Sequence, residues 1–460
     1  MAFWAMTLAV FIGLVALSVD FGRMAAAQSE LQSYADNVAL AAAGELNGLS
    51  DSITRATLAA QTFIIDTQTF GDGDVILSNE GDYQLAFFSS PPTPTSSGIA
   101  TTDPYFAGYI QVTATQQNVS AVFGAAFAAL TDQGSGEGLV NATAVAGFTQ
   151  YACDITPLMF CAPSIDFRAD DNIGNSILLR SGGQNASWLP GAFGFASPAG
   201  SVEVDEDGVC AGLSGAKLDI CLVSTVGNRT SCFAQSGIDI AGGQRVGNFE
   251  AALNVRFDIY HAGTNQLRND PDYPPAPNVL SSWEPASGQC IGNTGVLALA
   301  KIGLPADDCY DAGSCSRFGD GDWSQGRESY VDINYGGVDP FPSAVTRYDY
   351  YLAEIEASAG GSGGLLGSLI NDILPQCSNN TSSDPARRVV VAASIDCLNL
   401  TMSNGHSDVK VIEFVELFLT APIGLDGSKD IWVEIVAGVG GGSGGSDDEA
   451  RFREVVQLYR

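Results

Sequence analysis

Residues 1–47, MAFWAMTLAVFIGLVALSVDFGRMAAAQSELQSYADNVALAAAGELN, decide how the rest of the chain is organised. From Met1 to Val19 every residue is apolar or small, apart from the hydroxyl groups of Thr7 and Ser18. An α-helix rises about 1.5 Å per residue, so this run spans roughly 28 Å, close to the hydrocarbon thickness of a bilayer. The sequence therefore predicts a membrane-spanning helix at the N-terminus.

The helical pattern continues beyond the apolar run. The first charges are Asp20 and Arg23, and no proline or glycine follows Arg23 until Gly44. We expect one long helix within residues 1–47, half in the membrane and half outside. Asp20 and Arg23 lie three residues apart, so they share a helix face and are expected to pair at the membrane interface. The residues predicted to act in the anchor and its docking are Phe3, Trp4, Phe11, Asp20, Arg23, Ala35 and Ala39.

The outer half of this helix is rich in small side chains. The small residues that leave room for close approach of another helix or of the protein's own body are Ala25, Ala26, Ala27, Ala35, Ala39 and Ala42. The competing interpretation is a stalk in which alanine serves only helix propensity. The sequence favours packing against a partner and leaves the other interpretations open.

The string from Ser18 to Leu46 resembles the N-terminus of TadE/TadG-like proteins of the bacterial tight-adherence (Flp) pilus system. Further strings resemble larger TadG-related members, and they are Cys153–Cys161, Trp188–Phe195, Arg256–Tyr260 and Val456–Arg460. Proteins of this family usually carry a basic cytoplasmic tail before the membrane span, and this sequence shows none. We therefore expect a tail that was removed or that lies outside the sequence. The resemblance implies a role in pilus assembly or anchoring, or a minor subunit. A major pilin is disfavoured because that class is small and carries Glu at the fifth mature position, where Ala5 stands.

The amino-acid composition argues against two classes of binding partner. The chain has 460 residues, 45% of them hydrophobic, which is enough to bury a large core. Its net charge of −32 argues against binding nucleic acid, which requires clustered Lys and Arg, and against docking of the soluble part on anionic lipid.

Cysteine usage indicates the compartment. No C-x-x-C motif occurs and only two histidines are present, which disfavours zinc sites. All the cysteines follow the apolar segment, so we expect disulfides and place the body outside the cytoplasm. Cys153 with Cys161 is the favoured pair because a short loop closes easily, but the sequence leaves the connectivity open. The disulfide candidates are Cys153, Cys161, Cys210, Cys221, Cys232, Cys290, Cys309, Cys315, Cys377 and Cys397.

We predict an α+β protein with three parts: a transmembrane and stalk helix (1–47), a small α/β domain (48–150) and a cysteine-containing α+β domain (151–460). Helices are expected at 119–130, 211–223 and 363–374. Strands are expected, among others, at 109–115, 139–147, 255–260, 388–395, 409–419 and 431–436.

Catalytic motifs are weak. Gly360–Gly364 and Gly441–Gly445 both match G-x-S-x-G, but each lies in a low-complexity glycine run, and the histidine partner could only be His261 or His406. We therefore predict no enzyme activity, no cofactor and no small-molecule substrate. Trp188–Gly191 (WLPG) is interpreted as a packed turn, with a partner-binding surface as the alternative.

Paired acids suit calcium, a hard cation that prefers oxygen ligands, so Ca²⁺ in some acidic loop is a further hypothesis. The pairs are Asp72/Asp74, Asp170/Asp171, Asp205/Glu206/Asp207, Asp307/Asp308 and Asp320/Asp322.

Taken together, these observations predict a single-pass protein of the bacterial inner membrane, with a large domain in the periplasm or at the cell surface. Its expected partners are the membrane and other membrane or pilus-assembly proteins. One alternative is an accessory subunit that docks by its N-terminal helix onto another membrane complex, and a second is a surface hydrolase.

Overall fold

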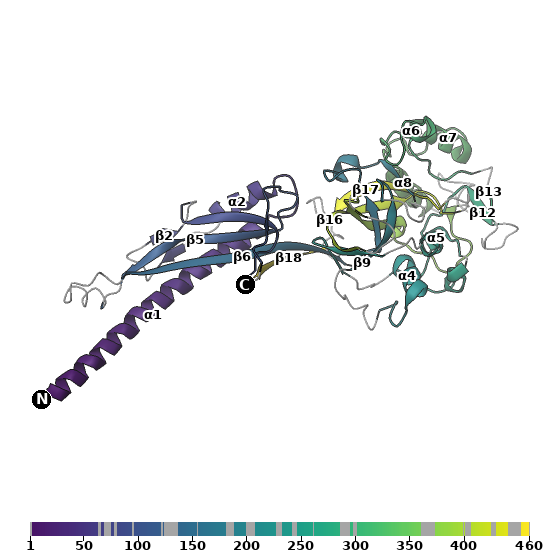
Figure 1. Cartoon of the computed structure of the whole chain (residues 1–460). Helices are drawn as coiled ribbons and strands as arrows, with labels where there is room; N and C mark the ends of the chain where they lie inside the picture. Colours follow the sequence, from purple (N-terminus) through teal and green to yellow (C-terminus); the bar gives the residue numbers. More distant parts are fainter. Residues whose placement is uncertain are drawn as a thin grey trace. The chain divides into compact units, whose positions relative to one another are not determined.

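The structure is a computed structural model of the whole chain (Figure 1). Its described residues are 2–62, 66–68, 75–77, 81–93, 96–120, 123, 137–153, 155–180, 188–198, 208–226, 232–241, 246–260, 262–285, 295–297, 301–359, 373–398, 400, 406–424, 429–439 and 452–459.

The chain divides into two compact units. The first comprises Met1–Gln150 together with Glu454–Arg460, and the second comprises Tyr151–Arg453. This division differs from the three predicted parts in two respects. The N-terminal helix is a part of the first unit rather than a separate stalk, and the C-terminal strand returns to that unit.

The first unit combines two helices with an antiparallel sheet. Helix α1 runs over Ala2–Ala43 and α2 over Ser52–Thr62. The sheet has the order β6-β5-β3-β4, and β18 pairs with β6. The strands are β3 (Tyr83–Ser90), β4 (Ile99–Ala100), β5 (Tyr109–Ser120), β6 (Glu137–Cys153) and β18 (Phe452–Tyr459), with β1 (Asp66–Gln68) and β2 (Val75–Leu77) forming a separate hairpin.

The core of the first unit lies between α1 and the sheet. Leu31, Tyr34 and Val38 recur at helical spacing on the buried face of α1. Opposite them, alternate residues of β5 and β6 point inward, including Val112 and Ala144, which are direct neighbours in the register. The apolar face of the helix, which repeats every 3.6 residues, and the apolar face of the strands, which repeats every 2 residues, thus pack together in one layer.

The second unit is built on an eight-stranded sheet of order β15-β11-β9-β7-β14-β16-β17-β8. Neighbours are antiparallel except β7 and β14, which are parallel. The strands are β7 (Leu158–Cys161), β8 (Ser176–Leu179), β9 (Phe193–Pro198), β11 (Ile238–Ile240), β14 (Val389–Ile395), β15 (His406–Val409), β16 (Val411–Leu419) and β17 (Ile431–Val439). Shorter pairs are β12 (Trp283–Pro285) with β13 (Gly295–Leu297), and β10 (Cys232–Ala234) with the last residues of β6.

Both faces of this sheet are covered. Along β14, Val390 and Ala392 belong to one apolar cluster, while Val391 and Ala393 belong to another. Because both sets are buried, β14 is a continuous apolar run instead of an alternating strand. The helices of the unit are α4 (Gly215–Ser224), α5 (Val246–Asn254), α6 (Asp308–Asp311), α7 (Ser324–Tyr335) and α8 (Arg347–Ala359), with 3₁₀ turns η1 (Asp170–Asn172), η2 (Val255–Phe257), η3 (Ala262–Leu267) and η6 (Pro385–Arg388). The predicted α+β class is confirmed.

Two predicted elements are wrong. In place of the strand expected at 255–260, residues 255–257 form η2, which continues α5. Asp258 then adopts a left-handed conformation (φ 62°), and this conformation ends the helix. The Asp258 carboxylate accepts the Ser378 amide N–H at 2.8 Å, which holds this conformation in place. The helix expected from residue 119 is wrong at its start, since β5 continues to Ser120.

Two other helix predictions have different outcomes. The helix expected at 211–223 begins later, at Gly215, as α4. The helix expected at 363–374 lies almost wholly outside the described residues.

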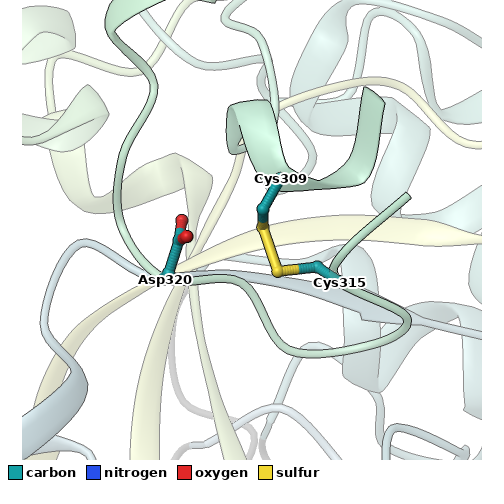
Figure 2. Close-up of side chains that lie close together, drawn as sticks. All are labelled: Cys309, Cys315 and Asp320. Carbon is teal, nitrogen blue, oxygen red and sulfur yellow. A yellow bond between two sulfur atoms is a disulfide. The ribbon is translucent and has the colours of Figure 1, made fainter. Parts of the chain in front are cut away.

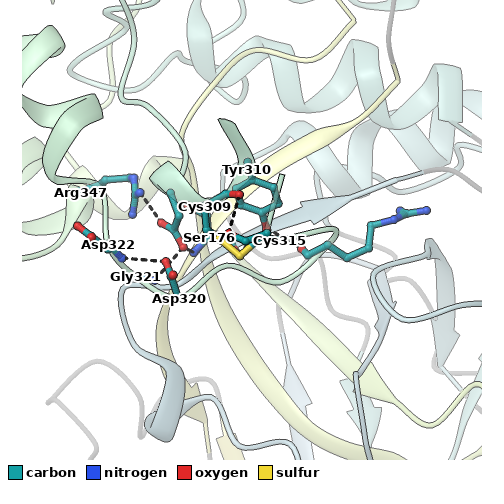
Figure 3. Close-up of a disulfide and its surroundings, with 11 residues drawn as sticks. Ser176, Cys309, Tyr310, Cys315, Asp320, Gly321, Asp322 and Arg347 are labelled. Atoms are coloured by element: carbon teal, nitrogen blue, oxygen red, sulfur yellow. Dashed lines mark hydrogen bonds and ion pairs between the residues drawn. A yellow bond between two sulfur atoms is a disulfide. The ribbon is translucent and has the colours of Figure 1, made fainter. Parts of the chain in front are cut away.

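A buried ionic centre ties α8 to the sheet of the second unit. Arg347 at the start of α8 is fully buried, and its guanidinium pairs with Asp307 and with Glu434 of β17 (3.0 Å). Asp307 also accepts the Gly321 amide N–H at 2.8 Å. Figure 3 shows Arg347 beside the loop that carries Gly321. Buried charges are tolerated when each is paired and hydrogen-bonded, as these are.

Candidate functional site: the N-terminal helix

The first half of α1 carries an exposed apolar surface. Phe3 and Trp4 are each 77% exposed and Phe11 is 65% exposed. Further exposed apolar side chains follow up to Phe21, and they lie all around the helix: Ile12, Leu14, Val15, Leu17 and Val19. A helix that is apolar on every side and uncovered by its own protein requires an apolar surrounding. Among the described residues, α1 is also the one helix long and apolar enough to cross a membrane.

The second half of α1 is part of the first unit's own core. Ala35 and Ala39 are completely buried there, together with Ala42. The prediction that Ala35 and Ala39 contact a partner is therefore corrected. Their small size allows close approach of the protein's own sheet, and in this structure neither is accessible to a second protein.

Asp20 and Arg23 stand where the exposed and buried halves meet, and both are half-buried. The Asp20 carboxylate accepts the backbone N–H of Phe123 at 3.3 Å. This contact gives Asp20 a partner in the body of the first unit, in addition to the role at the membrane interface that the sequence predicts.

A groove of about 960 Å³ follows the exposed side of α1's second half. Its helical wall contains Ala25, Ser29 and Ser33, which recur every four residues and are exposed. The opposite wall includes Thr143 of β6 and Tyr459 of β18. Gln32 also lines the groove, and its side-chain amide donates to the Thr143 carbonyl at 3.1 Å. The four-residue spacing of the small side chains is the sequence signal for this groove. The small residues predicted from the sequence for close approach include Ala25 but not Ser29 or Ser33.

The helix is also the part of the chain that is similar to known proteins. Residues 1–45 match the family model described as putative Flp pilus-assembly TadE/G-like. The match coincides with α1 and confirms the resemblance predicted from Ser18–Leu46. It ends at residue 45 and describes nothing beyond that point. No curated protein and no solved structure matches the chain.

Among the described residues, four disulfides cross-link the second unit. They are Cys153–Cys232, Cys161–Cys397, Cys210–Cys221 and Cys309–Cys315, whereas Cys290 lies outside the described residues. The predicted pair Cys153–Cys161 is wrong. Cys161 lies at the end of β7, whose parallel neighbour β14 brings Cys397 within a Cα–Cα distance of 5.5 Å. Cys153 lies at the end of β6, directly opposite Cys232 of β10.

One group of possible metal ligands is present among the described residues. Cys309, Cys315 and Asp320 bring ligand atoms within 4.8 Å of one another (Figure 2). The two sulfurs are bonded to each other, so they do not offer the thiolates that metals bind. The geometry supports a disulfide here rather than a metal centre.

Among the described residues, carboxylates of the acidic pairs accept hydrogen bonds from backbone N–H groups. Asp308 accepts the amide N–H groups of Gln325 and Gly326 in the first turn of α7, where helical N–H groups lack partners. Asp170 accepts the Gly438 N–H, and Asp320 accepts that of Asp322. Calcium binding stays a prediction. The pairs at 72/74 and 205–207, both G-x-S-x-G matches and His261 lie outside the described residues, and His406 lies in β15 opposite Ile240.

Glu413 of β16 is a partly buried carboxyl group whose raised pKa affects stability. Burial raises its pKa to about 7, against the lowering effects of the Ala169 N–H, which donates to it at 2.7 Å, and of Arg168. The negative charges of Asp170 and Asp171 raise the pKa further. A raised pKa in the folded state means that the native protein binds the proton more tightly than the unfolded chain. The stabilisation of the folded state by this tighter proton binding is fully present below about pH 4.5 and is lost as the pH rises through 7.

We expect Glu413→Gln to stabilise the second unit at pH 8 by about 2–3 kcal/mol and to leave it unchanged at about pH 4.5, because a neutral amide removes the cost of the buried charge. The glutamine oxygen can still accept the Ala169 N–H. Urea unfolding of the full chain in detergent at both pH values measures the difference. Glu328→Gln, an exposed position on α7, is the control. Equal stability of Glu413→Gln and wild type at the higher pH contradicts the account.

Proposed function

We propose that this chain is a membrane-anchored structural or assembly protein of a Tad/Flp-type pilus. The observation that carries the proposal is the coincidence of three properties in α1. Residues 1–45 match a pilus-assembly family, the first half of the helix exposes apolar side chains on all sides, and the second half is fixed in the core of a folded unit. Such a helix holds a body at a membrane surface.

The proposed location is the bacterial inner membrane, crossed once, with the body in the periplasm or at the cell surface. The disulfides support an extracytoplasmic body, because disulfides persist in oxidising compartments. The proposed role is structural, through protein–protein contacts rather than catalysis. The groove along Ala25, Ser29 and Ser33 is the proposed contact surface for another pilus-assembly protein, because small side chains allow another backbone to approach closely.

The test is complementation of a deletion strain of the bacterium that carries the gene. Deletion is expected to abolish surface pili, and the wild-type gene to restore them. Ser29→Trp, which fills the groove, should leave the protein in the membrane fraction at normal level but fail to restore pili. Ser50→Trp, at an exposed position of the same unit, should restore them.

Three results decide the proposal. Pili in the deletion strain contradict the pilus function. Pili in the Ser29→Trp strain contradict the groove as the contact surface. Loss of pili together with recovery of a different membrane complex by cross-linking favours the accessory-subunit alternative instead.

A further inference from the structure

The sheet of the first unit ends beside the apolar half of α1, where β5 stops at Ser120 and β6 starts at Glu137. We propose that this end of the sheet is a second membrane contact, in which Phe123 and Leu139 enter the lipid interface next to the helix. The inference rests on the proposed function, because it places the same unit at the same membrane. It adds a surface that the family match at residues 1–45 does not include.

Helix α1 and strand β6 run side by side in the same direction (Figure 1). The side chain of Met24 fills the space where a Cβ at Gly138 would stand. Further along both elements, Gln32 donates to the Thr143 carbonyl at 3.1 Å. Later residues of the helix therefore lie beside later residues of the strand. In the other direction, the start of β6 lies beside the part of α1 that comes just before Met24.

This register brings the sheet to the boundary between the two halves of α1. Asp20 stands at that boundary, and its carboxylate accepts the Phe123 backbone N–H at 3.3 Å. The next helical residue, Phe21, is 61% exposed. Ser120 of β5 pairs with Glu137 of β6, so both strands end at the same place. The sheet end thus reaches the point on α1 where the exposed apolar surface begins.

Two large apolar side chains are exposed at the sheet end. Phe123 is 45% exposed and Leu139 is 62% exposed, whereas Gly138 on the other face of β6 is buried. Gly138 is level with Met24, which follows Asp20 by four residues, or about 6 Å along the helix. The polar layer of a bilayer is about 5–7 Å thick on each side. If the hydrocarbon ends near Asp20, Leu139 and Phe123 both lie within this layer.

Lipid is the proposed occupant because the exposed side chains continue an apolar surface that already requires it. A bilayer that surrounds Phe21 also reaches Phe123, whose backbone is bonded to the preceding helical residue, Asp20. The contact is made with apolar lipid chains rather than with anionic headgroups. The sequence from Phe123 to Leu139 contains Asp132 and Glu137 but no Lys or Arg, and anionic headgroups attract basic segments.

A second contact would change how the first unit is held. A single spanning helix leaves the body free to turn about the helix axis and to shift in depth. The helix and the sheet end belong to one compact unit, so contact of both with the bilayer fixes the rotation and the depth of that unit together.

The test uses the full chain, purified and reconstituted in phosphatidylcholine nanodiscs. One residue at a time is replaced by the photoreactive amino acid p-benzoylphenylalanine, and mass spectrometry after irradiation measures the yield of lipid adducts. Phe123 and Leu139 are the probes of the sheet end. Phe11, in the exposed apolar half of α1, reports on the anchor itself.

Ile99 of β4 is the matched control, because it is 65% exposed and belongs to the same unit. It pairs with Ser90 of β3, beyond the point where β3 pairs with Tyr109, the first residue of β5. The length of β5 from Tyr109 to Ser120 is more than about 30 Å, so Ile99 lies far from the sheet end that contacts the membrane.

We expect adduct yields at Phe123 and Leu139 about tenfold above the yield at Ile99, because apolar surroundings favour an exposed apolar side chain over water by at least about that factor. Adducts at Phe11, with Phe123 or Leu139 no higher than Ile99, overturn the second contact and leave the anchor intact. Absence of adducts at Phe11 contradicts the anchor and this inference with it. Cross-links from Phe123 to a second copy of the chain in place of lipid also overturn the second contact.

Discussion

Replacement of Arg347 by methionine is expected to destabilise the second unit by at least about 3–5 kcal/mol. The guanidinium is fully buried between the carboxylates of Asp307 and Glu434, which are also fully buried. Methionine keeps most of the stem but leaves two buried negative charges without a cation. The loss is larger than for a single pair because Arg347 also donates to the Gly174 carbonyl at 3.1 Å.

Urea unfolding of the full chain, followed by circular dichroism, measures this loss. Lys429→Met is the control, since Lys429 is 45% exposed in its pair with Glu250 and such pairs contribute about 0–1 kcal/mol. The triple variant Arg347→Met, Asp307→Asn, Glu434→Gln should recover part of the stability because no charge remains buried. A single Arg347→Met variant within about 1 kcal/mol of wild type contradicts the structural role of this centre.

The helix and the sheets could be predicted because their signals are local. The apolar run before Asp20 and the alanine-rich continuation identify α1 without any tertiary information. Which face of α1 is buried could not be predicted in the same way. Ala35 and Ser33 are both small, and only the position of the sheet decides that Ala35 faces the core while Ser33 lines the groove.

The sequence-based predictions that failed concern contacts between segments that are far apart in the sequence. Cys161 meets Cys397, 236 residues away, because β7 and β14 are parallel neighbours, and no short-range pattern encodes that adjacency. The same holds for Arg347, whose two carboxylate partners come from a loop and from β17. Asp258 is different, because its left-handed conformation is a local event that an apolar run concealed.

The second large effect concerns the anchor. Phe11 and Val15 lie one helical turn apart, and both are exposed in the apolar half of α1. An aspartate at the centre of a membrane-spanning helix costs about 2.5–3.5 kcal/mol, so the double substitution to aspartate should cost about 5–7 kcal/mol. This cost corresponds to a loss of membrane partition of more than about a thousandfold. The control is Val338→Asp with Val345→Asp, which changes the charge equally at two exposed apolar positions of the second unit.

The most direct test of the membrane anchor is flotation of these proteins with vesicles after a carbonate wash. Wild type and the Val338/Val345 control should float with the lipid, and the Phe11→Asp, Val15→Asp variant should remain at the bottom of the gradient. Flotation of the Phe11/Val15 variant together with wild type would contradict the claim that the exposed half of α1 anchors this protein in a membrane.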